Sequence, residues 1–508
     1  MRRRAALLCW LAVLWAAGPS GALGAAAPKP ITVAMPAGTL RGTEADGLRT
    51  FLGVPYAQPP VGALRWRAPR ALGPWSGVRD ALRFGPECMQ GARAAAAVPM
   101  SEDCLYLNVW VPARRRPRQL PVMVWVHGGA FKVGTASQPV YEGASLARAG
   151  LIVVTLNYRL GKFGFLAHPA LTAEDSDGLL GNYGLMDVIG ALHWVHTNIK
   201  SLGGDPRKVT LAGQSAGGAA VYDLMTSPLA AGLFSQAIIE SGVFSTPTTP
   251  FATAERDGAA AARTWDPGAT DAAALRRLPA AQIQGSGPPL AGNFGPMIDG
   301  KVLPEDIATA FDAGRMARVP LLIGSNSYEA GFFGDTGKGL AQRLGESWRR
   351  VTAVYDGYGT HQTELIEKQL TTDMMITAPT RTAARAAAAR GAPTFVYYYS
   401  YVPPAQRTRT PGASHMDEVY ALFGHLNLMP GGAAADAATT PIVAALQERW
   451  ARFVTTGTPA SKAEPWPPLD LDAPQLLEFT NSGAVVRSNF ARERLDLAAA
   501  IPAGAVQP

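Results

Sequence analysis

Residues 209–218 constrain the fold of this chain more than any other stretch. They read V-T-L-A-G-Q-S-A-G-G, so a β-branched run leads into Gly213-Gln214-Ser215-Ala216-Gly217 and small residues follow. Glycines on both sides of the serine predict a strand, a very tight turn and a helix, with Ser215 exposed at the apex. Free N–H groups at the start of that helix would face a developing negative charge. A Gly-flanked serine alone usually marks an ordinary loop, so a base, an acid and further N–H donors must come from elsewhere.

Composition places the chain among globular proteins and argues against a nucleic-acid partner. Of its 508 residues, 47% are hydrophobic and 17% are charged, which is ample for a large core. The formal net charge is +7, but no basic stripe alternates with aromatic residues. We interpret the arginine-rich segment 114–118, which lies between two strand-like runs, as a solvated hairpin loop rather than a nucleic-acid contact.

Residues 1–27 have the pattern of a secretory signal peptide. Three arginines precede an apolar run from residue 5 to residue 17, and helix-breaking and small residues follow. We therefore expect a signal peptide over residues 1–27, one domain over residues 28–508, and export to the periplasm or the medium. The apolar run is too short to span a bilayer comfortably, so no stable membrane anchor is expected, and a retained anchor is the minority interpretation.

The three cysteines fit an exported protein. Cys9 lies inside the signal pattern, which leaves Cys88 and Cys104 as an even pair separated by a short loop. A disulfide is the natural interpretation in an oxidising compartment. No histidine lies near either cysteine, and two ligands do not make a zinc site, so no metal is expected.

Short, fully apolar runs recur along the chain and predict strands buried on both faces. They cover residues 122–126, 151–157, 209–212, 237–240, 320–324 and 395–399. Helical spacing over residues 183–199 lies between two of these runs. Strand and helix alternate, which predicts an α/β fold with a large, mostly parallel sheet and helices on both faces. Weaker patterns over residues 245–293 and 338–385 predict helical insertions that cap the sheet, and residues 51–67 predict an ordered loop.

A glycine-rich segment follows the predicted strand at residues 122–126. It reads His127-Gly128-Gly129-Ala130-Phe131. Glycines let backbone N–H groups approach a substrate oxygen closely, and such a loop upstream of G-x-S-x-G is more specific than a plain turn. We expect His127 to support this loop rather than transfer protons.

Candidates for a base and an acid lie downstream of Ser215. The order serine, acid, histidine favours His361, His415 and His425 over the earlier histidines. Of these, His415 lies in a loop beyond a late predicted strand, which suits a base. Glu329 follows the predicted strand at residues 320–324, where a carboxylate can orient an imidazole. A lone glutamate in a loop is more often solvated, so spacing alone gives Glu329 little weight.

Motifs across residues 32–468 resemble those of type-B carboxylesterases, the cholinesterase-like branch of the α/β-hydrolases. The matching pieces share an order along the chain as well as their residues. They are segments 51–67, 101–109, 127–131, 157–161, 181–187, 203–206, 213–217, 324–333, 415–424, 450–459 and 466–467.

The resemblance implies an α/β-hydrolase fold and an esterase that acts on a small-molecule ester without a cofactor. It implies Ser215 as nucleophile, His415 as general base and then acid, and Glu329 as orienting acid. The implied oxyanion donors are the backbone N–H groups of Gly129, Ala130 and Ala216. It further implies the Cys88–Cys104 disulfide, the ion pairs Arg65–Glu102 and Arg159–Asp187, and Glu418 as a supporting acid.

Departures from the family pattern bear on the substrate. Gln214 stands where many members have glutamate, and Ala94 stands where cholinesterases have a choline-binding tryptophan. Both changes favour uncharged or anionic esters over choline esters. Tyr328 and Ala330 replace the usual neighbours of the acid. A lipase, a serine peptidase and a non-catalytic binding protein on the same fold remain alternatives, and the ester and the oligomeric state stay open.

Overall fold

The computed structural model describes residues 27–91, 98–114, 118–244, 248–285, 293–357, 362–432 and 439–506. Residues 1–26 of the expected signal peptide, Ala94 and His361 lie outside the described residues.

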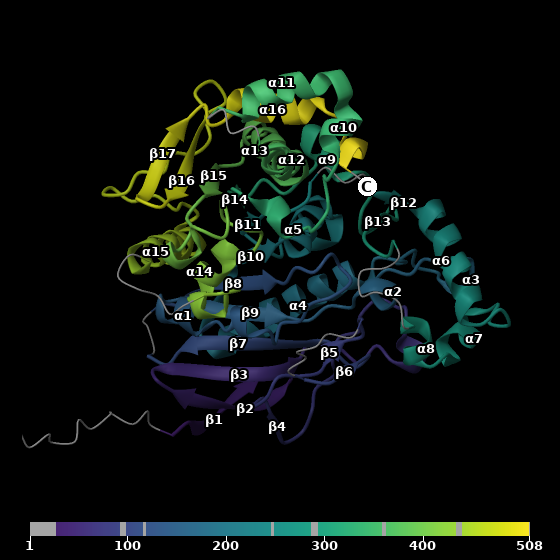
Figure 1. The fold of residues 1–508 in the computed structure, drawn as a ribbon. Coiled ribbons are helices and arrows are strands. Elements are labelled where there is room, and N and C mark those ends of the chain that lie inside the picture. The colour runs from purple at the N-terminus through teal and green to yellow at the C-terminus, as the bar shows by residue number, and fades with distance from the viewer. Residues whose placement is uncertain are drawn as a thin grey trace, which may run out of the picture.

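One large sheet runs through the described part of the chain (Figure 1). Its strand order is β1-β2-β3-β7-β9-β8-β10-β11-β14-β15-β16-β17, and β4 pairs with β2. The bounds are β1 (Lys29–Met35), β2 (Gly38–Ala45), β3 (Leu48–Pro55), β4 (Val78–Asp80), β7 (Tyr106–Pro112), β8 (Leu120–Val126), β9 (Ile152–Leu156), β10 (Gly204–Gln214), β11 (Gln236–Glu240), β14 (Leu321–Asn326), β15 (Thr394–Tyr399), β16 (Gln475–Thr480) and β17 (Gly483–Ser488).

Seven neighbouring strands in the middle of this sheet, from β9 to β16, pair in parallel. The outer pairs β1–β2, β2–β3, β3–β7, β7–β9 and β16–β17 are antiparallel. The mostly parallel sheet predicted from the apolar runs is therefore confirmed.

Both faces of the sheet are buried, which explains why its strands are apolar throughout. On β8, Val124 and Val126 belong to one hydrophobic core, whereas Met123 and Trp125 belong to another. Successive side chains of a strand point to opposite faces, so the sheet separates the two cores. Continuous apolar runs rather than alternating ones follow from this arrangement.

Helices cover both faces of the sheet (Figure 1). The first core includes residues of α4 (Tyr183–Asn198), α5 (Ala216–Thr226) and α13 (Ala378–Ala389). The second core includes residues of α1 (Ala144–Arg148), α14 (Asp417–Phe423) and α15 (Thr440–Thr456).

Two groups of helices extend beyond these layers, and the segments predicted to form helical insertions supply only part of each group. At the right of Figure 1 lie α3 (Pro169–Glu174), α6 (Phe251–Trp265), α7 (Ala272–Arg277) and α8 (Ala280–Gln284). At the top, α10 (Leu340–Leu344), α11 (Trp348–Tyr355), α12 (Thr363–Thr372) and α16 (Arg492–Ala500) share a third core. Shorter elements are α2 (Gly161–Gly164), α9 (Ile307–Asp312), β5 (Glu87–Cys88), β6 (Met100–Ser101), β12 (Thr249–Pro250) and β13 (Met297–Ile298).

The loop expected over residues 51–67 is wrong at its start, because residues 51–55 complete β3. Phe51 lies opposite Val109 of β7, and the register shifts before Val54. Gly53 takes up this bulge with a φ of 68°, and its N–H donates to the Asn108 side chain at 3.0 Å. Pairing with β7 therefore outweighs the turn-forming composition.

No helix among the described residues is both long enough and apolar enough to cross a bilayer.

Candidate active site

The candidate residues gather at the carboxyl ends of the central parallel strands, the edge where open α/β sheets hold their ligands. The glycine loop (residues 127–131) follows β8, Ser215 follows β10, Ser241 follows β11, and Glu329 follows β14. His415 comes from the loop between β15 and α14. Five segments that are distant in the sequence thus meet at one edge.

Ser215 occupies a strained turn between β10 and α5. Its backbone φ and ψ are 57° and −123°, a conformation that residues other than glycine rarely adopt. A Cβ on Gly213 would lie 2.5 Å from the backbone of Gly217, and one on Gly217 would lie 2.0 Å from the oxygen of Val126. The Ser215 N–H donates to the oxygen of Glu240 at 2.9 Å, which ties the turn to β11. The strand, tight turn and helix predicted from residues 209–218 are therefore present.

The glycine loop lies against this turn. A Cβ on Gly128 would be 3.0 Å from Ser215 Cβ, so the loop and the serine are in direct contact. Positive φ angles at Gly129, Ala130 and Phe131 (114°, 55° and 59°) curl the backbone. Within the described residues, no oxygen accepts a hydrogen bond from the N–H of Gly129 or Ala130. Such unpaired N–H groups can bind a substrate oxygen.

His127 supports the loop, in line with the sequence interpretation. Its Nδ1 lies 2.8 Å from the oxygen of Gly128, and its ring stacks on Tyr158 with centroids 4.6 Å apart. The Tyr158 hydroxyl donates to the His127 oxygen at 3.0 Å.

His415 and Glu329 form the central polar pair of the site. His415 Nδ1 lies 2.6 Å from Glu329 Oε2, and both side chains are buried. Glu329 Oε1 accepts hydrogen bonds from the Asn326 N–H and the Ser241 hydroxyl, each at 2.7 Å. These donors fix the carboxylate, which in turn orients the imidazole.

The opposite nitrogen of the imidazole, His415 Nε2, has no hydrogen-bond partner among the described residues. No hydrogen bond joins Ser215 to His415 in this part of the chain. The tight turn at residues 213–217, called the elbow below, is joined to His415 by the residue before the serine. Gln214 Nε2 donates to the His415 backbone oxygen at 2.5 Å. Catalytic contacts of this kind often tighten only when substrate binds.

Aromatic rings cover the imidazole. Phe332 and Phe333 lie with ring centroids 5.3 Å and 4.8 Å from that of His415. Phe332 is 59% exposed, so it presents an apolar surface beside His415.

Further carboxyl groups lie behind Glu329. The Ser241 hydroxyl lies 3.4 Å from Glu418, and Asn326 Nδ2 donates to the same carboxyl group. Burial raises the pKa of Glu418 well above its ordinary value, and the nearby Glu240 and Glu329 raise it further. Burial also raises the pKa of Glu240 to about 8, although Trp450 Nε1 donates to it at 2.7 Å.

Sequence reasoning did not identify Glu240, Ser241 or Asn326 as parts of the site. Ser241 has a positive φ of 47° and directly follows the buried strand β11. Their position could have identified them. They are polar residues at the carboxyl end of a predicted buried strand, which is also where Ser215 and Glu329 lie.

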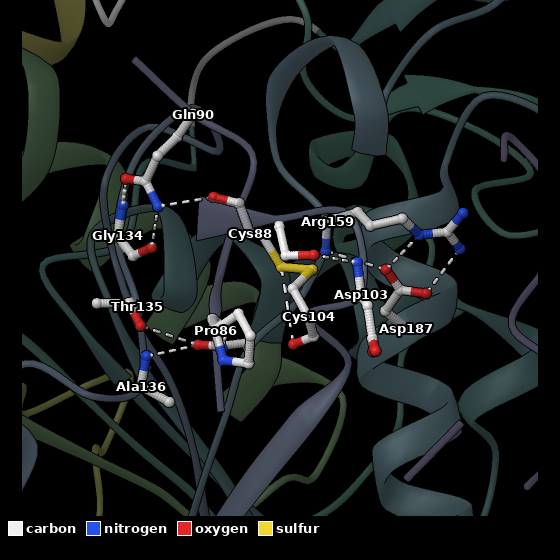
Figure 2. Close-up of a disulfide and its surroundings, with 12 residues drawn as sticks. Pro86, Cys88, Gln90, Asp103, Cys104, Gly134, Thr135, Ala136, Arg159 and Asp187 are labelled. Carbon is white, nitrogen blue, oxygen red and sulfur yellow. Dashed lines mark hydrogen bonds and ion pairs between the residues drawn. A yellow bond between two sulfur atoms is a disulfide. The ribbon is translucent and has the colours of Figure 1, made fainter. Parts of the chain in front are cut away.

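Cys88 and Cys104 form a disulfide (Figure 2). Gln90, two residues beyond Cys88, connects this bridge to Gly134, which lies just beyond the glycine loop. Its Nε2 donates to the Gly134 oxygen, and its Oε1 accepts from the Gly134 N–H, both at 2.9 Å.

Both expected ion pairs are present. Arg159 donates to Asp187 through Nε at 2.8 Å and Nη2 at 2.7 Å (Figure 2). Arg65 donates to Glu102 through Nε at 2.6 Å. These ion pairs join neighbouring segments of the chain. Within the described part of the chain, they make no hydrogen bond to His415 or Glu329. No group of His, Cys, Asp and Glu in the described residues could hold a metal ion.

Comparison with known proteins identifies the family of this chain. The sequence profile of the carboxylesterase family matches residues 29–362 and 351–498. The chain is 36% identical over 457 residues to the fumonisin B1 esterase of Sphingopyxis macrogoltabida, covering 83% of this chain and 81% of that protein. It is 34% identical over 467 residues to the para-nitrobenzyl esterase of Bacillus subtilis, covering 85% and 91%.

Solved structures extend the match to the fold. A PNB esterase structure superposes with a TM-score of 0.78 at 32% identity, covering 92% of this chain and 99% of the other. A thermophilic PNB esterase gives 0.79 at 31% identity, covering 92% and 99%. Matching sequence and matching fold together lead to one conclusion: the chain belongs to the carboxylesterase family and is an α/β-hydrolase that acts on small-molecule esters.

Proposed function

We propose that this protein is an exported serine carboxylic-ester hydrolase that works through an acyl-enzyme on Ser215. The main support is the buried hydrogen bond between His415 Nδ1 and Glu329, while Nε2, on the other side of the ring, has no partner among the residues that the structure describes. In this arrangement the neutral imidazole accepts the Ser215 proton as the hydroxyl attacks the ester carbonyl.

The glycine loop and the start of α5 would hold the charge that develops on the carbonyl oxygen. Gly129 and Ala130, in the loop beside Ser215, and Ala216, directly after it, would supply the backbone N–H groups. Preorganised donors stabilise an oxyanion more than a neutral carbonyl, which lowers the barrier. His415 then protonates the leaving alcohol, and water activated by the same imidazole releases the acid.

Replacement of Ser215 tests the proposal. Ser215→Ala should lower kcat/KM on a p-nitrophenyl ester by about three orders of magnitude or more. Ser227→Ala is the control, because Ser227 is a buried serine at the far end of α5. The control should keep its activity, whereas comparable activity in both variants would rule out Ser215 as the nucleophile.

Substrate comparisons separate the alternatives. An esterase should hydrolyse soluble p-nitrophenyl esters faster than peptide anilides or emulsified long-chain esters. Fumonisin B1 and p-nitrobenzyl esters belong in the panel, because relatives carry those names. A preference for anilides would indicate a peptidase, one for emulsions a lipase, and no turnover at all a binding protein.

The neutral Gln214 leads us to propose uncharged or anionic esters as substrates. No carboxylate at that position adds an attraction for a cationic alcohol group. An acylcholine should therefore react no faster than its uncharged carbon analogue. A clear preference for the acylcholine would contradict this part of the proposal.

Export is proposed from residues 1–27 and is consistent with the disulfide. Expression of the full chain, cell fractionation and amino-terminal sequencing of the product would test it. An uncleaved chain in the cytoplasm would contradict it.

A further inference from the structure

Gln214 holds the loop that carries His415. Its side chain is 1% exposed, and Nε2 donates to the His415 oxygen at 2.5 Å. An amide oxygen in that place would face a carbonyl oxygen, so the donor orientation is the one that chemistry allows.

Other hydrogen bonds of this loop lead to the Glu329 side of the site. The Ala413 N–H donates to the Ser327 hydroxyl at 2.8 Å, and Asn326 Nδ2 donates to the Ser414 oxygen at 2.6 Å. Residues 413–416 form the histidine loop. In the part of the chain that the structure describes, only the hydrogen bond from Gln214 joins this loop to the elbow.

The other end of the carboxamide faces the glycine loop. A Cβ on Gly128 would lie 3.0 Å from Gln214 Oε1 and 3.0 Å from Ser215 Cβ. One side chain therefore lies between the glycine loop, the elbow and the histidine loop. In the proposed mechanism these three segments carry the oxyanion donors, the nucleophile and the base.

We propose that Gln214 is a positioning residue whose carboxamide fixes the His415 backbone relative to Ser215. This inference rests on the proposed function of those two residues. It assigns to Gln214 a mechanical role, separate from the absence of charge.

The surroundings explain why an amide rather than a carboxylate suits this place. Glu329 already lies against the imidazole, Glu418 and Glu240 lie behind Glu329, and Asp417 follows two residues later. An ionised glutamate at position 214 could not donate to the His415 oxygen, and it would add one more buried anion. A protonated glutamate could still donate.

Gln214→Met removes the donor while keeping the length of the side chain. We expect kcat to fall about tenfold, the loss that corresponds to one hydrogen bond, while KM changes less than about twofold. The rate of inactivation by an organophosphonate should fall in parallel, since it reports the same attack by Ser215.

Gln236→Met is the matched control. Gln236 is 7% exposed, and its Nε2 donates to the Phe453 oxygen at 2.9 Å, remote from the site. Both methionine variants should lose thermal stability, but Gln236→Met should keep its kcat. If Gln214→Met also keeps its kcat, the residue is merely structural and the inference is wrong.

Gln214→Glu provides a second readout. Its kcat relative to the unmodified enzyme should be highest at acidic pH, where the new buried carboxyl group is protonated, and should fall as that group ionises. Gln214→Met has no ionisable group at this position, so its kcat relative to the unmodified enzyme should not change with pH. If the same ratio for Gln214→Glu also does not change with pH, the inference is wrong. Ser215→Ala in the same assay keeps the two claims apart: retained activity there rejects the proposed function, and normal activity in the Gln214 variants rejects only the positioning role.

Discussion

At the scale of single residues, the site depends on the groups that hold the proposed catalytic side chains. Ser215 is held by the oxygen of Glu240, and Glu329 by Asn326 and Ser241. Ser215 was predicted from its flanking glycines and His415 from a loop beyond a late strand, whereas Glu329 was predicted as the acid only from the resemblance to the family. The hydrogen bonds between them could not be predicted, since they join loops that meet only once β10, β11 and β14 are side by side.

Glu329→Gln should lower kcat by about three to four orders of magnitude, because an amide cannot hold the imidazole in the tautomer that accepts the serine proton. Steady-state kinetics on a p-nitrophenyl ester would measure it. Glu364→Gln, at an exposed glutamate, serves as control. A Glu329→Gln loss below tenfold would show that another group orients His415.

Asp223 is a second residue with a measurable consequence. It is 1% exposed in α5, neither carboxyl oxygen has a hydrogen-bond partner among the described residues, and burial raises its pKa well above the ordinary value. The folded state therefore keeps a proton that the unfolded state releases, so the free energy of unfolding falls as the pH rises above about 4.

Asp223→Asn should remove this loss. The Tm of the variant should exceed that of the unmodified protein by more at pH 8 than at pH 5. Asp335→Asn, at an exposed carboxyl group, should show no such difference. An equal effect of Asp223→Asn at both pH values would mean that Asp223 is ionised in the fold.

At the scale of elements, buried strands were the most predictable part of the fold. Runs such as residues 122–126 are apolar because both faces of the sheet are covered. Strand ends at the surface were not predictable in the same way. β10 begins at Gly204, but Arg207 and Lys208 are exposed and the register shifts before Val209. The hairpin β16–β17 lies at the sheet edge with Val485 and Val486 exposed, so it lacks an apolar run.

The disulfide is the element whose removal should affect both stability and activity. Its loop spans 16 residues, and opening such a loop costs about 3 kcal/mol of stability. Cys88→Ser with Cys104→Ser should lower the Tm, and a reductant should do the same to the unmodified protein.

Gln90→Leu separates the two effects. It keeps the disulfide but releases Gly134 beside the glycine loop. We expect kcat to fall with a smaller change in Tm than in the cysteine variant. Unchanged kinetics in Gln90→Leu would show that the bridge acts on stability alone.

At the scale of the whole molecule, several buried acids share one direction of pKa shift. Burial raises the pKa of Asp417 to about 7 and that of Glu240 to about 8, and it raises that of Glu418 well above its ordinary value. Each binds a proton in the fold that the unfolded chain has lost, so stability falls with rising pH until the folded-state value is passed. The lowered pKa of His168 acts in the opposite direction only below about pH 6.5.

The Tm should therefore decline between about pH 6.5 and pH 8. Glu240→Gln preserves an acceptor for Trp450 and should make that decline shallower. Thermal unfolding at several pH values would measure both curves. Parallel curves would contradict the assignment of a proton to the Glu240 carboxyl group. This behaviour was not predictable from the sequence, because it depends on burial that only the assembled fold creates.

The central claim, that Ser215 is the nucleophile, is tested most directly by labelling with an organophosphonate probe and mapping the adduct by peptide mass spectrometry. The result we predict is one adduct per chain on the peptide that contains Ser215, with loss of esterase activity in proportion to labelling. An adduct on another residue that accounts for the lost activity, or full activity in a chain modified at Ser215, would contradict the mechanism.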